Sequence, residues 1–203
     1  MTTATRRAFV LGSLGGLLLL GGCDRLTGAA SKPTFHFTDI TGAEFARRLD
    51  LPDADGKPRS LADWKGKVTV VFFGYTQCPD VCPTTMAELA QVRTLLGADG
   101  DRLQTVFVTI DPERDTPAVL KAYVANFGPG VVALRGDAEQ TAAAAKEFKV
   151  FYAKAPGKTP GSYTMDHSAA SFVFDAAGRV RLFVPYGGDP TILAADIKQL
   201  VAG

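Results

Sequence analysis

The fold is decided by Val68-Thr-Val-Val-Phe-Phe-Gly-Tyr-Thr-Gln-Cys78-Pro-Asp-Val-Cys82-Pro83-Thr-Thr-Met-Ala-Glu. Residues 68–73 are an apolar run, rich in β-branched and aromatic side chains, which predicts a fully buried strand. A turn with two cysteines follows. Beyond it, apolar residues recur at helical spacing, and Pro83 suits the first position of a helix, where its missing N–H has no partner to lose. The stretch therefore predicts a strand, a two-thiol turn and a helix.

The spacing of the two cysteines indicates chemistry at this turn. Cys82 is expected at the helix N-terminus, where unpaired N–H groups and the positive end of the helix dipole favour a thiolate. Cys78 comes four residues earlier, close enough for the two sulfurs to meet. Such a pair can hold a soft metal ion or oxidise to a disulfide. The alternative is two buried structural cysteines, but buried thiols rarely cluster at a strand-to-helix turn between prolines.

Composition excludes several classes of protein. The 203 residues suit one domain plus a leader, and 46% hydrophobic with 21% charged residues is ordinary for a globular chain. A net charge of +1 gives no electrostatic basis for binding nucleic acid, and no interior segment is long and apolar enough to span a membrane.

The N-terminus predicts export and a lipid anchor. Arg6-Arg7 precedes an apolar run that ends at Leu20, and residues 1–22 resemble a signal peptide of the lipoprotein type, exported by the twin-arginine or the general secretory route. Cys23 would become the lipidated N-terminus, followed by a tether over residues 23–34 and a domain over 35–203. Asp24 resembles a signal for retention in the bacterial inner membrane, facing the periplasm. The alternative is a signal anchor with an incidental cysteine.

The remaining pattern predicts an α/β fold. It has a mixed central sheet, helices on both faces and an N-terminal β extension near residues 35–37, in a topology that resembles thioredoxin. Residues 45–51 read as a strand or a helix, and residues 52–58 as a turn, since the acidic pair there lacks the other ligands of a calcium loop. Further strands are expected at 103–110, 131–134, 170–174 and 180–184, with helices beginning at Pro117, Ala138 and Pro190.

A third ligand would turn the thiol pair into a metal site. His167 lies just before the strand that opens the closing hairpin, in a loop that faces the cysteine turn in thioredoxin-like folds. The other histidine, His36, is expected to be an exposed residue on an edge strand. Two thiolates and one imidazole suit copper as Cu(I) and Cu(II), whereas zinc usually takes a fourth ligand or water.

Three segments together resemble the Sco/SenC family of copper-binding assembly proteins. They are Phe72-Phe-Gly-Tyr-Thr-Gln-Cys-Pro-Asp-Val-Cys-Pro-Thr-Thr, Val108-Thr-Ile-Asp-Pro-Glu-Arg-Asp-Thr-Pro and Tyr163-Thr-Met-Asp-His-Ser. The resemblance implies a thioredoxin-like fold that binds copper through Cys78, Cys82 and His167. It also implies help in assembling the dinuclear copper site of cytochrome c oxidase subunit II, with that subunit or another copper chaperone as partner, and we expect a monomer. Asp111, Arg114 and Asp115 also match a loop of this family. The resemblance leaves open whether they support the metal site or contact a partner.

Two other functions remain open at this stage. A thiol–disulfide oxidoreductase without metal would use Cys78 and Cys82 as its redox pair, although three residues separate them instead of the two usual in thioredoxins, and no proline lies near His167. A peroxidase of the same fold would need an isolated cysteine of low pKa, which a paired thiol suits poorly.

Overall fold

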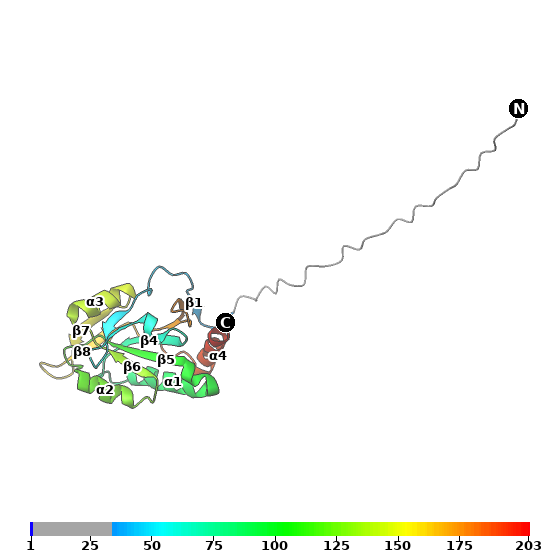
Figure 1. Ribbon diagram of the computed structural model, residues 1–203. Helices are drawn as coiled ribbons and strands as arrows, with labels where there is room; N and C mark the ends of the chain where they lie inside the picture. Colours follow the sequence, from blue (N-terminus) through cyan, green and yellow to red (C-terminus); the bar gives the residue numbers. More distant parts are fainter. Residues whose placement is uncertain (2–33) are drawn as a thin grey trace. The chain divides into compact units, whose positions relative to one another are not determined.

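A six-stranded mixed sheet forms the centre of the protein, whose structure is a computed structural model that describes Met1 and residues 34–203 (Figure 1). The strand order is β1-β10-β9-β4-β5-β6, with β4, β5 and β6 parallel and the other neighbours antiparallel. The strands are β1 (Thr38–Asp39), β4 (Val68–Gly74), β5 (Leu103–Thr109), β6 (Val131–Leu134), β9 (Ser171–Phe174) and β10 (Val180–Val184). The predicted mixed sheet is confirmed.

The two central strands explain why this sheet lies in the core. All seven residues of β4 and all seven of β5 are buried, in parallel register from Val68 opposite Leu103 to Gly74 opposite Thr109. Continuous apolar runs of this kind need cover on both faces, which the helices supply. The strands run side by side, so the loops that follow them leave the sheet at the same edge.

The helices cover both faces, as predicted. Figure 1 shows α3 (Ala138–Glu147) on the opposite side of the sheet from α1 (Val81–Leu95), α2 (Pro117–Ala125) and α4 (Pro190–Ala202). On the first side, Phe73 of β4 packs against Phe148, with ring centroids 5.0 Å apart. On the other, Phe107 of β5 packs against Tyr123 of α2 at 5.2 Å. None of the described helices is long and apolar enough to cross a bilayer.

Two short hairpins lie outside the central sheet. The first pairs β2 (Asp50–Pro52) with β3 (Pro58–Ser60), so the turn predicted at 52–58 is correct, while only the end of the ambiguous segment 45–51 is a strand. The second pairs β7 (Tyr152–Pro156) with β8 (Tyr163–His167). The sequence did not indicate this second hairpin, because its strands are separated by a Pro/Gly-rich loop and neither is an apolar run. Two 3₁₀ helices complete the chain, η1 (Leu61–Trp64) and η2 (Gly97–Arg102).

Helix α1 begins earlier than the sequence predicted. It starts at Val81, so Pro83 is its third residue instead of its first. Proline is tolerated there because none of the first four N–H groups of a helix has a partner within the helix. Cys82 is therefore the second residue of the helix.

The start of the domain is fixed to its last helix by one buried carboxylate. Asp196 of α4 is fully buried and accepts hydrogen bonds from the backbone N–H groups of His36, at 2.9 Å, and Phe37, at 3.0 Å. The ring Nδ1 of His36 lies 2.7 Å from the same carboxylate, while 61% of the histidine side chain is exposed. His36 is therefore exposed, as predicted, and lies just before the edge strand β1.

We expect Asp196→Ala to lower the free energy of unfolding by about 2–3 kcal/mol, because at least two N–H groups lose their acceptor at about 1 kcal/mol or more each. Urea unfolding of the full chain measures the change. Asp101→Ala is the matched control, since Asp101 also pairs with a cation but is 93% exposed, and its loss should cost less than about 1 kcal/mol. Equal effects of the two substitutions would contradict this account.

Candidate metal centre

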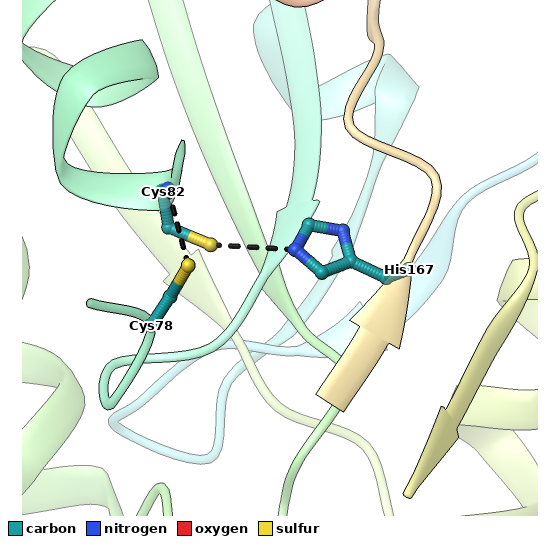
Figure 2. A group of neighbouring side chains, drawn as sticks. All are labelled: Cys78, Cys82 and His167. Carbon is teal, nitrogen blue, oxygen red and sulfur yellow. Dashed lines mark hydrogen bonds between the residues drawn. The ribbon is translucent and has the colours of Figure 1, made fainter. Parts of the chain in front are cut away.

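Three separate elements bring the predicted ligands together. Cys78 lies in the loop after β4, Cys82 is the second residue of α1, and His167 is the last residue of β8. One potential ligand atom from each residue lies within 4.8 Å of the other two, and Figure 2 shows the imidazole pointing at the sulfur pair. Cys82 Sγ lies 3.5 Å from His167 Nε2. Cys23, the predicted lipidation site, lies outside the described residues.

A carboxylate beneath the cysteine loop fixes its path. Asp115 is fully buried and accepts hydrogen bonds from the Thr76 N–H at 3.1 Å, the Thr76 hydroxyl at 2.5 Å and the Thr109 hydroxyl at 2.5 Å. Burial raises the pKa of Asp115, while these hydrogen bonds act in the opposite direction. Thr76 lies two residues before Cys78, so Asp115 joins the end of β5 to the loop that carries the thiol. The sequence left the role of Asp115 open.

The orientation of His167 leaves one ring nitrogen free to bind a metal. Its Nδ1 lies 3.0 Å from the backbone carbonyl oxygen of Ser168, which can only accept a hydrogen bond. Nδ1 therefore donates this hydrogen bond, and Nε2 is the ring nitrogen that faces the sulfurs. Phe72 and Tyr75 pack edge-on against the imidazole, with ring centroids 6.2 and 5.9 Å away, and limit its rotation.

The two sulfurs differ in protonation. The hydrogen bond from the Cys82 thiol lowers the pKa of Cys78 to about 3, and the Cys82 backbone N–H also donates to Cys78 Sγ at 3.4 Å. The pKa of Cys82 is raised by the same thiol–thiol bond and by burial. The helix N-terminus was expected to favour a thiolate at Cys82, but the raised pKa of that thiol places the negative charge preferentially on Cys78. The helix N-terminus lowers the pKa of Cys82 by less than burial and the neighbouring negative sulfur raise it. The negative charge is more stable on Cys78, because that sulfur is partly exposed.

These donors suit a soft metal ion. Cys78, Cys82 and His167 would hold such an ion, and their potential ligand atoms already lie within 4.8 Å of one another. Cys78 and His167 are half-buried, so the cluster reaches the surface, whereas Cys82 is fully buried. Among the described residues, His36 is not part of this group, as the sequence predicted.

Gly74 leaves the space that the buried sulfur occupies. A Cβ at this position, the last residue of β4, would lie 2.9 Å from Cys82 Sγ and 2.9 Å from a ring carbon of Phe72. We expect Gly74→Ala to lower the free energy of unfolding by about 1–3 kcal/mol, because the crowded groups must shift. In a Cys82→Ala background the loss should be smaller, because one of the crowding atoms is gone. Urea unfolding of the four chains provides the test, and an identical loss in both backgrounds would contradict it.

The chain is similar in sequence and fold to known proteins. The SCO1/SenC family profile matches residues 37–202. A mouse relative, "Protein SCO2 homolog, mitochondrial", is 39% identical over 142 residues, which are 69% of this chain and 54% of that protein, so the chain spans about half of its length. The structure of ScoI from Bradyrhizobium japonicum with copper bound is 39% identical, with a TM-score of 0.69 over 78% of this chain and 99% of that one.

A third match is the crystal structure of a SCO1/SenC family lipoprotein from Bacillus anthracis, which is 25% identical, with a TM-score of 0.68 over 82% of this chain and 99% of that one. These structures confirm the predicted thioredoxin-like fold. The family profile covers nearly all of the described domain, including both cysteines and the histidine. The chain belongs to the SCO1/SenC family.

Proposed function

We propose that this chain binds copper through Cys78, Cys82 and His167 and helps assemble the dinuclear copper site of cytochrome c oxidase. The observation that carries the proposal is the convergence of two sulfurs and one imidazole nitrogen within 4.8 Å. Copper accepts this set in both oxidation states, because thiolates suit Cu(I) and an added imidazole also suits Cu(II). The copper-bound ScoI of Bradyrhizobium japonicum, at 39% identity, supports this choice of metal.

Copper is the cargo in this proposal, and the site suits a cargo that must leave again. Three protein donors leave a coordination position to which a ligand from a partner can bind. Cys78 and His167 are partly exposed, so an incoming thiolate or imidazole can approach from solvent. Cys82 is fully buried and would be the last ligand to dissociate from the copper ion. Transfer then proceeds by exchange of one ligand at a time, without exposing a bare ion.

The setting that we propose is the periplasmic side of a bacterial inner membrane. Support comes from the sequence of residues 1–34, where a signal peptide, a lipidated Cys23 and a short tether are predicted. The Bacillus anthracis relative is described as a lipoprotein. An anchored monomer of this kind would meet membrane-bound partners such as cytochrome c oxidase subunit II or another copper chaperone.

We expect His167→Ala to weaken Cu(II) binding by more than about 100-fold, because losing a ligand should exceed the about 10–100-fold effect typical of supporting residues. The free energy of unfolding should change little, since the ring is half-buried. Competition titration of the full chain with a copper chelator measures the affinity.

His36→Ala is the matched control, because it removes the other histidine of the sequence, which lies outside the ligand group. It should bind Cu(II) as the wild type does. Unchanged Cu(II) binding by His167→Ala would overturn the site, and equal losses in both variants would show that the effect is not specific to the ligand.

The state of the two sulfurs also supports a second function, the reduction of disulfides in the oxidase subunit or in other exported proteins. The Cys78 thiolate would attack one sulfur of a target disulfide, forming a mixed disulfide and releasing the other target sulfur as a thiolate. Cys82, on losing its proton, would then attack Cys78. The products are an oxidised Cys78–Cys82 pair and a target with two reduced cysteines. No bond to His167 forms or breaks in this exchange, so His167→Ala should weaken Cu(II) binding far more than it slows disulfide reduction.

We expect iodoacetamide to alkylate Cys78 much faster than Cys82 in the reduced chain. The rate at Cys78 should stay nearly constant from pH 5 to pH 8, since its pKa of about 3 keeps it a thiolate throughout that range. At pH values below its pKa, an ordinary thiol would instead react about tenfold faster for each unit by which the pH is raised. Mass spectrometry of the labelled peptides measures both rates, with Cys78→Ser as the control for assignment. A rate at Cys78 that rises tenfold per pH unit would contradict the assignment.

A further inference from the structure

The histidine of the candidate site is carried by a part of the chain that the central sheet does not hold. Strands β7 and β8 pair only with each other and form a separate two-stranded sheet. Both cysteines, in contrast, follow directly from β4, a buried strand at the middle of the six-stranded sheet. Figure 2 shows the arrangement, with the imidazole reaching across from the end of its own strand. The chain joins His167 to β9 of the central sheet through residues 168–170, and side-chain contacts of the hairpin add a second constraint on the distance between histidine and cysteines.

Arg114 makes contact with both sides of this gap. Its Nη1 donates a hydrogen bond to the backbone carbonyl of Tyr163, the first residue of β8, at 2.8 Å. The same nitrogen donates to the side-chain oxygen of Gln77, the residue before Cys78, at 3.2 Å. The guanidinium carbon also lies 3.6 Å from the centre of the Tyr163 ring, in cation–π contact. One side chain thus joins the start of the histidine strand to the cysteine loop.

Arg114 is itself held in place. Its Nε pairs with the carboxylate of Asp111, which is 2% exposed, and the arginine side chain is 19% exposed. The hydroxyl of Tyr163 donates to the same carboxylate at 2.9 Å. Asp111, Arg114 and Tyr163 therefore form a closed triangle of contacts, which we call the arginine clamp. A second, smaller tie runs beside it, where the hydroxyls of Tyr75 and Thr164 lie 2.7 Å apart.

We propose that Arg114 is a positioning residue, which holds the β7–β8 hairpin against the cysteine loop and so sets the distance from His167 Nε2 to the sulfurs. The consequence for copper rests on the function proposed above, whereas the holding of the hairpin does not. An arginine suits the task because its planar group can stack on a ring and donate in two directions at once. Lysine offers a single charged point and could not make these contacts together.

The test compares Arg114→Gln with Arg59→Gln in the full chain. Arg59 is a matched control, because its side chain is 24% exposed and pairs with the buried Asp53 at 2.8 Å, yet it lies on β3, outside the clamp and the ligand group. Two measurements are made on each variant. Amide hydrogen exchange of residues 163–167 without metal reports how firmly the hairpin is held, and chelator competition gives the Cu(II) affinity, with absorption and electron paramagnetic resonance spectra of the bound ion.

For Arg114→Gln we expect faster exchange at residues 163–167, Cu(II) binding weakened by about 10–100-fold and an altered Cu(II) spectrum. The spectrum matters because a loss of overall stability alone would not change the geometry at the ion. Arg59→Gln should match the wild type in hairpin exchange, affinity and spectrum. Should Arg114→Gln fail to fold, Tyr163→Phe removes one contact of the clamp and keeps the ring, and it should shift the same measurements in the same direction by a smaller amount.

The outcomes separate this inference from the proposed function. Unchanged exchange at residues 163–167 in Arg114→Gln overturns the inference, whatever the copper results. Faster exchange with wild-type affinity and spectrum overturns the role of the clamp at the metal site. If His167→Ala binds copper like the wild type, the proposed site fails, while hairpin exchange still decides whether Arg114 holds the hairpin.

Discussion

The parallel pairing of β4 with β5 places the loops that follow both strands at one edge of the sheet, where they supply one ligand of the candidate site and the carboxylate that holds its loop. The loop after β4 supplies Cys78, and the loop after β5 supplies Asp115. Because Asp115 accepts hydrogen bonds from Thr76 and Thr109, the strand pairing continues as side-chain bonding beyond the ends of the strands. Arg135 strengthens this corner by donating to the backbone carbonyls of Asp115 and Pro112, each at 2.9 Å.

Local signals made much of this arrangement predictable from the sequence. Residues 68–88 show the local sequence patterns of a buried strand, a turn and a helix in succession. These patterns are readable because burial, chain reversal and helical periodicity each depend on neighbouring residues. The same holds at Pro117, the expected first residue of α2, where the side chain of the preceding Thr116 caps the helix. The approach of His167 to the cysteines was also predicted, although only through the general placement of that segment in thioredoxin-like folds.

Features that depend on distant partners were not predictable in this way. Backbone pairing between β7 and β8 and contacts with other elements stabilise this hairpin. Neither strand shows a local sequence pattern that indicates the pairing. The protonation of the sulfurs depends on which of them is more deeply buried, and that differs between two cysteines only four residues apart. The contacts of Arg114 leave no local signal in the sequence, because its partners Gln77 and Tyr163 are 37 and 49 residues away.

The ligands come from two parts of the fold, which has a physical consequence for any ion bound there. Cys78 lies in the loop after β4 and Cys82 on α1, beside a buried strand whose local opening is costly, whereas the histidine lies on a two-stranded hairpin, a structure of marginal stability by itself. Holding that hairpin with polar side-chain contacts makes the imidazole the donor that can move with least disturbance of the core. A site built to keep its metal permanently would gain from placing all donors on the central sheet. A site that must pass its metal on benefits from one donor that can leave first, and the geometry around His167 has this property.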